Sequence, residues 1–535
     1  YDDAESLIKK QQRKTKNKIL FIDLGYVQQL QKQEAEALES YNLALEAIQE
    51  NPNLAHQYSE KFSSFGLYPQ ALKAYEIAER MNPNVAYHYQ KGLLYAEMGD
   101  LENMYAEYLE MISQSPTYYA NIQQRISNNI SDDPENESNL VLKRQLIKKI
   151  QESQNILFTN LLIWLYIEEA QYGQAFRQLK ALDKRNENQE PQIFSLGEKA
   201  LSADDYNIAL ECFSYLEKKG PMGFLYEEAI YNKLATLREQ TQANPEAKKA
   251  DYEKLVREHY AILPQLMGNE KYVYTKRDIA KMLNFNLALS DSAISSLQKT
   301  IAYFGEGYKK PVAECKMMLG DILLGEGKSI DALFKYMEVE RAYNGTPLGD
   351  DAKFQKGMVA YYTADFPWAL SQFEVLKSSS TKLISNDALQ MALLISDNST
   401  EDTLYQGLTY YAKADLFRFR NLLDSAVYTL DLLLAVFPDH AIKEEAMLLK
   451  GEILYQEAKY NEAVETLETM LANSGGDVWA DDALMLLGRI YANAFGDKNK
   501  AMQAYEKILF EHPGSTYVPE ARRMYRALRG DNLSN

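Results

Sequence analysis

The chain has 535 residues, of which 46% are hydrophobic and 25% are charged, and its formal net charge is −18. This length exceeds what one compact core supports, so we expect several domains or one extended array. The composition is that of a folded protein. The excess of carboxylates opposes binding to phosphate backbones and to anionic lipid surfaces, so nucleic acid is not an expected partner.

Turn-forming residues are scarce, with 25 glycines and 15 prolines in the whole chain. This scarcity favours helices joined by short loops over β-sandwiches or loop-rich enzymes. No apolar run reaches the length of about eighteen residues that a membrane-spanning helix needs, so we expect no transmembrane segment.

A fixed spacing of small and aromatic residues recurs along the chain. Gly92 is followed at offsets of 3, 12, 16, 19 and 24 residues by Tyr95, Met104, Tyr108, Met111 and Pro116. The pattern recurs in whole or in part after Gly25, Gly197, Gly320, Gly357, Gly451 and Gly488, and a second half of it occurs at Ala426, Leu430, Leu433 and Pro438. Self-similarity at a fixed period of this length is the signature of a repeat architecture.

Each position in the pattern has a physical reason. Residues three or four apart lie on one face of a helix, so the spacing predicts two helices joined by a short turn. The small residue allows the two helices to approach closely, and the aromatic residue sixteen positions later fills the groove between them. Proline ends the second helix because it cannot donate a backbone hydrogen bond.

This pattern resembles the tetratricopeptide repeat family, with about ten to twelve units along the chain. The resemblance implies an all-α solenoid, a right-handed superhelix of helix-turn-helix units, and a scaffold or adaptor that binds a protein or peptide without catalysis. The chain begins in the middle of a repeat, so we expect it to be part of a longer protein.

The repeats in residues 430–530 are similar to those of bacterial envelope proteins, namely the β-barrel assembly lipoprotein and the Tol-Pal coordination factor. This likeness implies a periplasmic setting with association to the outer membrane; a cytoplasmic setting is the alternative.

The quality of the pattern varies along the chain, which predicts five segments. They are an N-terminal stack with a truncated first repeat (1–116), an irregular loop plus helix (117–154), a repeat pair (155–223), longer degenerate helical repeats (224–310), and a C-terminal stack with a capping helix (311–535).

Motifs for catalysis, cofactors and metals are not found, so we expect no catalytic, cofactor-binding or metal-binding residues. The two cysteines, Cys212 and Cys315, are about a hundred residues apart and form no CxxC pair, and we expect both to be buried in helices. The alternatives are a glycan- or peptide-capture protein of the outer membrane and, third, an all-α carbohydrate-active enzyme.

The resemblance also implies which residues face the concave groove: those six and three before each repeat glycine, and those one and four after it. In the C-terminal stack these positions alternate carboxylates with apolar or aromatic side chains, which suits a segment with basic and apolar residues. The alternative for the apolar members is that they pack between neighbouring first helices. The candidate partner-binding residues are Glu314, Met317, Asp321, Asp351, Phe354, Met358, Tyr361, Glu445, Leu448, Glu452 and Tyr455.

Overall fold

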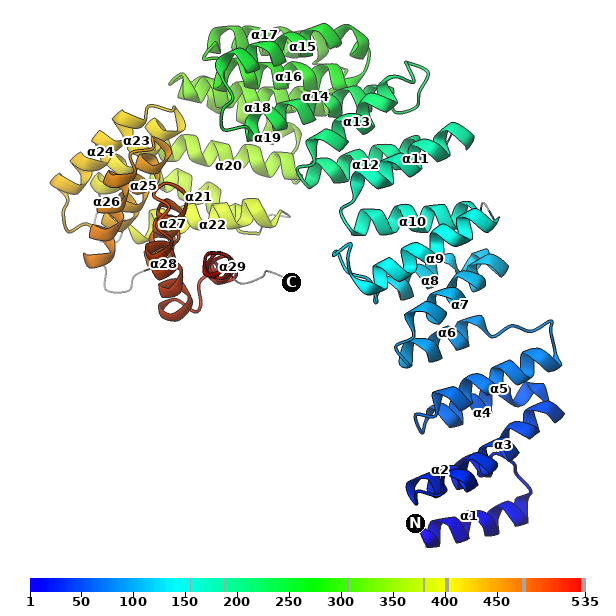
Figure 1. Cartoon of the computed structure of the whole chain (residues 1–535). Coiled ribbons are helices and arrows are strands. Elements are labelled where there is room, and N and C mark those ends of the chain that lie inside the picture. The colour runs from blue at the N-terminus through cyan, green and yellow to red at the C-terminus, as the bar shows by residue number, and fades with distance from the viewer. Residues whose placement is uncertain are drawn as a thin grey trace. The chain divides into compact units, whose positions relative to one another are not determined.

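The computed structural model describes residues 1–153, 155–186, 188–305, 307–378, 381–399, 404–473 and 478–530. Within these ranges every regular element is a helix and there is no β-strand, so the predicted all-α fold is confirmed (Figure 1). The chain divides into an N-terminal unit, Tyr1–Ala243, and a C-terminal unit, Asn244–Asn535. The division falls inside the segment 224–310, for which the sequence predicts longer helices.

The N-terminal unit consists of helices α1 to α14 and two short 3₁₀ helices. Their bounds are α1 Asp2–Thr15, α2 Leu20–Leu30, α3 Glu34–Glu50, η1 Pro52–Leu54, α4 Ala55–Ser63, α5 Tyr68–Met81, α6 His88–Glu97, α7 Leu101–Gln114, η2 Pro116–Tyr118, α8 Tyr119–Ser127, α9 Glu137–Ser153, α10 Ile156–Glu168, α11 Tyr172–Asn186, α12 Glu190–Ser202, α13 Tyr206–Glu217 and α14 Tyr226–Ala243.

The C-terminal unit contains the remaining helices. Their bounds are α15 Lys249–Ile262, η3 Leu263–Leu266, α16 Glu270–Phe285, α17 Ser290–Phe304, α18 Lys309–Gly325, α19 Ser329–Ala342, α20 Pro347–Tyr362, α21 Phe366–Leu376, α22 Lys382–Asp397, α23 Gln406–Phe419, α24 Leu423–Val436, α25 Lys443–Gln456, α26 Tyr460–Asn473, α27 Ala480–Asn493, α28 Lys498–Glu511 and α29 Val518–Arg529.

Most helices pack as antiparallel pairs, among them α2–α3, α6–α7, α12–α13, α18–α19 and α27–α28. We call the helix that carries the repeat glycine, or another small residue in its place, the first helix of its pair. A Cβ atom at Gly92 would lie 2.3 Å from the Tyr108 ring, and one at Gly320 would lie 2.5 Å from the Tyr336 ring. The equivalent pairs are Gly25–Tyr41, Gly197–Phe213, Gly357–Phe373, Gly451–Leu467 and Gly488–Tyr505. The small residue is therefore required because a side chain from the second helix packs directly against its backbone.

The turn inside the pairs recurs at nearly the same place. In six of the seven pairs the residue seven positions after the repeat glycine has a positive φ, for example 71° at Gly99, 62° at Ala364 and 58° at Ala458, and after Gly488 it is the eighth residue, Gly496 (66°). A single left-handed residue ends the first helix and turns the chain back into the second. Because even alanine takes this conformation here, the packing of the two helices must outweigh its steric cost.

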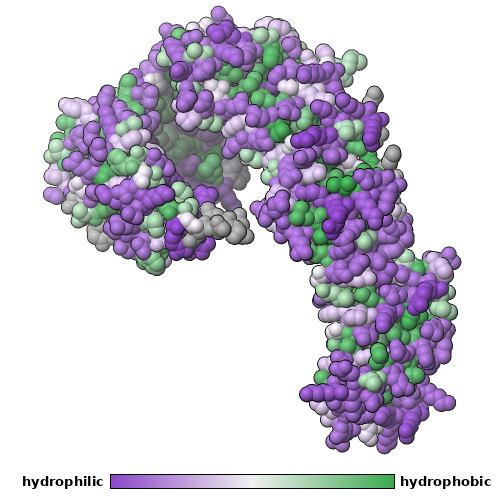
Figure 2. Space-filling model, viewed as in Figure 1, coloured by the Kyte–Doolittle hydropathy of each residue, from purple (hydrophilic) through white to green (hydrophobic). Residues whose placement is uncertain are grey.

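The cores lie between the paired helices and between neighbouring pairs. Cys212 and Cys315 are fully buried in them, as predicted. The space-filling view shows a mostly hydrophilic surface with small apolar patches, and the C-terminal unit is hollowed on the face in view (Figure 2).

Candidate functional site

The predicted groove residues lie on the first helices α18, α20 and α25 of the C-terminal unit. Met317, Leu448 and Tyr361 are only 7%, 8% and 0% exposed. Their side chains pack between neighbouring helices, so they support the surface and are not open to a partner.

Three other predicted residues are half-buried. The Phe354 ring packs on Phe373 at 5.4 Å between centroids, and the Tyr455 ring lies 5.8 Å from Tyr460. Met358 packs against the same core as Tyr361. These side chains therefore form part of the apolar support and keep some surface exposed.

Glu314 is already paired within the chain. Arg277 of α16 forms an ion pair with it and a second one, at 2.8 Å, with Asp278. An incoming cation would have to compete with Arg277 for this carboxylate.

The remaining four predicted residues belong to a larger set, which we call the carboxylate row. Its members come from five first helices: α18, α20, α23, α25 and α27. The row consists of Asp321, Asp351, Asp415, Glu445, Glu452 and Asp482.

Every carboxyl group in the carboxylate row has a raised pKa, and burial is the main cause in each case. Neighbouring charges add to this effect. The Asp351 carboxylate helps to raise the pKa of Asp321 to about 6. The carboxylates of Asp482 and Asp415 likewise help to raise the pKa of Glu452. Like charges from successive repeats are thus held close together on a poorly hydrated surface, although 48% of the Glu452 side chain is exposed.

Hydrogen bonds fix several members of the row in place. The Tyr336 hydroxyl donates to Asp321 at 2.7 Å, and the Tyr517 hydroxyl donates to Asp482 at 2.8 Å. The Asn398 side-chain amide donates to Glu445 at 3.2 Å. Carboxylates held in this way lose little conformational freedom when they bind a cation.

Arg418 of α23 is a cation within the carboxylate row. Its guanidinium contacts Asp415 at 2.8 Å and Glu452 at 3.3 Å. This arrangement demonstrates that the row can coordinate a guanidinium group through carboxylates of neighbouring repeats.

The sequence-based prediction missed Asp415 and Arg418 because their helix, α23, carries alanine where other first helices carry glycine. The signal was present: Ala414 stands twelve residues before Ala426, the spacing found after the repeat glycines. Asp482 was also missed, although it stands six residues before Gly488.

We expect Asp321→Asn to stabilise the protein at pH 7. Because folding raises the pKa of Asp321 from 3.8 to about 6, the folded state binds this proton more tightly than the unfolded state. The stability contributed by the protonated group is full below about pH 4 and is lost as pH rises to about 6. Removing the charge should raise the free energy of unfolding at pH 7 by on the order of 2 kcal/mol. The hydrogen bond from Tyr336 is kept, because the asparagine side-chain oxygen can still accept it.

Thermal unfolding followed by circular dichroism at pH 4 and pH 7 measures this effect. The matched control is Asp331→Asn on the exposed side of α19. Equal changes in the unfolding temperature of both variants at pH 7 would contradict the raised pKa of Asp321.

Within the described ranges, no helix is long and apolar enough to cross a membrane. Nor do the described histidine, cysteine and acidic residues form a cluster of three or more that could hold a metal ion.

Several solved structures are similar to this chain at 13–14% sequence identity. One is that of yeast Tom70, which is 14% identical; the match covers 95% of this chain and 99% of that chain, with a TM-score of 0.31. A second is a Naa15/Naa10 complex bound to HypK-THB, which is 13% identical; the match covers 98% of this chain and 93% of that chain, with a TM-score of 0.29. A third is a tetratricopeptide repeat protein from Parabacteroides merdae, also 13% identical; the match covers 57% of this chain and 98% of that chain, with a TM-score of 0.24. A search of curated protein sequences finds no match.

Family models described as tetratricopeptide repeat match residues 63–118 in the N-terminal unit and 482–515 in the C-terminal unit. The second match begins at Asp482, a member of the carboxylate row, and covers α28. Together with the helix pairs and the repeated contacts of the glycines with second-helix side chains, these matches show that the chain contains tetratricopeptide repeats in both units.

Proposed function

We propose that the C-terminal unit is a non-catalytic scaffold that grips a segment of a partner protein carrying basic and apolar side chains. Repeats of this family generally act in protein–protein interaction, which supports the scaffold role. The carboxylate row is the observation that supports a partner with basic side chains. In it, six acidic side chains from five first helices have raised pKa values.

A basic partner suits this surface for an energetic reason. Arg418 already pairs with Asp415 and Glu452, so an incoming cation shares these two carboxylates with it. Poorly hydrated like charges elsewhere in the row destabilise one another, and a lysine or arginine side chain placed among them relieves that repulsion while forming charge-assisted hydrogen bonds. The same charges attract a basic segment before contact and so accelerate its association. Half-buried apolar groups such as Phe354 and Met358 offer contact area for apolar side chains between the basic ones.

The experiment is a fluorescence anisotropy titration of the full chain with a labelled 12-residue peptide of alternating lysine and leucine. A peptide with glutamate in place of lysine serves as the comparison. We expect the chain to bind the lysine peptide but not the glutamate peptide, and to bind the lysine peptide more weakly at higher salt. Equal affinity for both peptides would contradict the proposal, as would retention of the chain on a glycan matrix with no binding to either peptide.

We expect the affinity for the lysine peptide to fall about tenfold between pH 7.5 and pH 5. The pKa of Asp321 is raised to about 6, so this carboxyl takes up a proton over this range and loses the charge that attracts lysine. The pKa values of the other row carboxyls are raised in the same direction. The peptide lysines titrate near pH 10 and do not change. Titrations at four pH values measure the effect, and an affinity independent of pH would count against the carboxylate row as the binding surface.

For the setting, we propose an assembly in a bacterial cell envelope, on the periplasmic side of the outer membrane. The likeness of residues 430–530 to envelope repeat proteins supports this placement. Cell fractionation of the native full-length protein tests it: recovery with the periplasmic or outer-membrane fraction is expected, and recovery with the cytoplasm would contradict it.

A further inference from the structure

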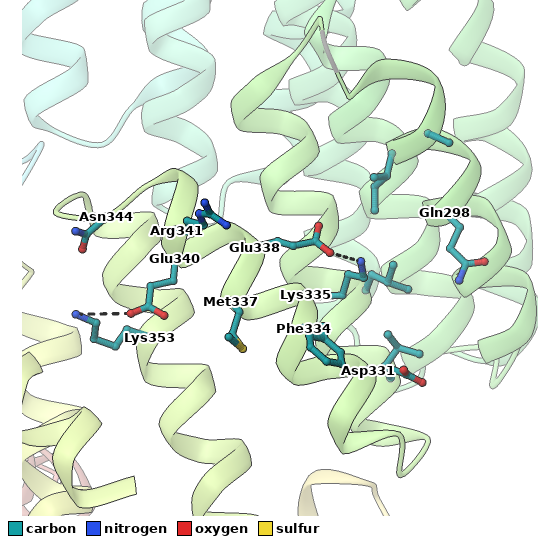
Figure 3. Close-up of a pocket in the computed structure, with 14 residues that line it drawn as sticks. Gln298, Asp331, Phe334, Lys335, Met337, Glu338, Glu340, Arg341, Asn344 and Lys353 are labelled. Carbon is teal, nitrogen blue, oxygen red and sulfur yellow. Dashed lines mark hydrogen bonds and ion pairs between the residues drawn. The ribbon is translucent and has the colours of Figure 1, made fainter. Parts of the chain in front are cut away.

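A second surface of the C-terminal unit lies between α17 and α19, and none of its lining residues belongs to the carboxylate row. It is a cavity of about 1150 Å³. Its apolar lining includes Ile301 of α17, Leu319 and Leu323 of α18, and Phe334 and Met337 of α19. Figure 3 labels Phe334 and Met337 among the residues that line it. This volume is larger than that of most small-molecule sites, which favours a macromolecular occupant.

The α19 wall carries an apolar stripe that the chain leaves uncovered. Ile330, Phe334 and Met337 are 70%, 56% and 44% exposed. They are spaced by four and three residues, so they lie on one face of the helix. Contiguous apolar surface of this kind on a soluble protein marks an interaction site.

The charges around the cavity divide into paired and unpaired groups. Glu338 forms ion pairs with Lys335 at 2.5 Å and Lys316 at 2.7 Å, and Glu340 forms one with Lys356 at 2.5 Å. In the part of the chain that the structure describes, Asp331 and Arg341 have no ion-pair partner. These two opposite charges stand ten residues apart on α19, about 15 Å along its axis.

We propose that this groove binds an amphipathic helix of a partner protein. The helix presents apolar side chains at positions i, i+4 and i+7 to Phe334 and Met337. It carries a basic side chain opposite Asp331 and an acidic side chain opposite Arg341, about three helical turns away. The complementarity of these two end charges selects a partner with one charge of each sign.

A helix fits the groove better than an extended segment does. The walls are helices whose backbone groups are already hydrogen-bonded, so they offer no edge with which a strand could pair. An extended segment would bury its own amide groups against Leu319 and Leu323 without partners, which is costly. A helix satisfies its backbone internally and needs only the apolar contact.

The test uses two labelled 18-residue helical peptides with the same leucine stripe. The mixed peptide carries one lysine and one glutamate ten residues apart, and the acidic peptide carries glutamate at both places. We expect the full chain to bind the mixed peptide about tenfold more tightly than the acidic one. Asp331→Lys should reverse this preference, and Phe334→Lys should abolish binding of both peptides.

Val375→Lys on α21 is the matched control, because Val375 is also exposed (58%) and lies outside the groove. Circular dichroism should show the same helical content in all variants. The variant Glu452→Lys/Asp482→Lys should bind the mixed peptide normally, which separates this proposal from that for the carboxylate row.

Failure of the mixed peptide to bind at about 1 mM would overturn the proposal, as would equal binding to the Phe334→Lys variant or a preference that Asp331→Lys does not reverse. Dimerisation of the chain that Phe334→Lys removes would assign the groove to a second copy and would also overturn it.

Discussion

Replacing Glu452 and Asp482 by lysine is expected to weaken binding of the lysine–leucine peptide at least 100-fold, or about 2.7 kcal/mol. The two carboxylates lie on neighbouring first helices, and the charge of Asp482 contributes to the raised pKa of Glu452. Two new ammonium groups would remove two acceptors and repel the peptide's own lysines. Fluorescence anisotropy at low salt measures the loss, because screening at high salt would reduce it.

The matched control changes the same number of charges on second helices. Glu465 of α26 and Glu506 of α28 are both exposed, so Glu465→Lys/Glu506→Lys alters net charge equally without touching the carboxylate row. We expect the control to weaken binding by less than about fivefold. Similar losses in both double variants would show that net charge, rather than this surface, governs the interaction.

Gly320→Ala is expected to destabilise the C-terminal unit by about 1–3 kcal/mol. The new Cβ atom would lie 2.5 Å from the Tyr336 ring, which is fully buried and cannot move aside without breaking its hydrogen bond to Asp321. Thermal and urea unfolding followed by circular dichroism measure the change.

Gly325→Ala in the same helix is its control. A Cβ atom there would meet nothing within 4 Å, so the variant should be as stable as the natural protein or more stable by up to about 1 kcal/mol. If Gly320→Ala proved as harmless as Gly325→Ala, the close approach of α18 and α19 at Tyr336 would be wrong.

The repeat architecture could be predicted because its determinants are local. Glycine and the aromatic residue sixteen positions later belong to one helix pair, so their contact depends only on helix geometry and a short turn. The contacts Gly92–Tyr108 and Gly357–Phe373 follow directly from this spacing.

The exposure of the groove residues could not be predicted in the same way, because it depends on how successive pairs pack. Tyr361 and Tyr455 both stand four residues after a repeat glycine, but Tyr361 is fully buried and Tyr455 is only half-buried. The superhelix also brings together residues distant in sequence: the Arg420 guanidinium donates to the carbonyl of Gly325 at 2.8 Å, ninety-five residues away. Spacing within one repeat contains no information about such contacts.

The helix α23 was missed for a different reason. The predicted pattern begins with glycine, yet the physical requirement is a side chain small enough for close approach of the two helices, and Ala414 meets it. A pattern that allows any small residue twelve positions before a second-helix alanine predicts Asp415 and Arg418 as well.

The most direct test of the central claim is zero-length carbodiimide coupling of the full chain to the lysine–leucine peptide, followed by mass spectrometry of the cross-linked sites. This chemistry joins a carboxylate to a lysine amine only when the two are in contact. The account predicts peptide attachment at members of the carboxylate row, chiefly Glu452 and Asp482, and little at Glu465 or Glu506. Attachment spread evenly over exposed carboxylates, or concentrated on the second helices, would contradict it.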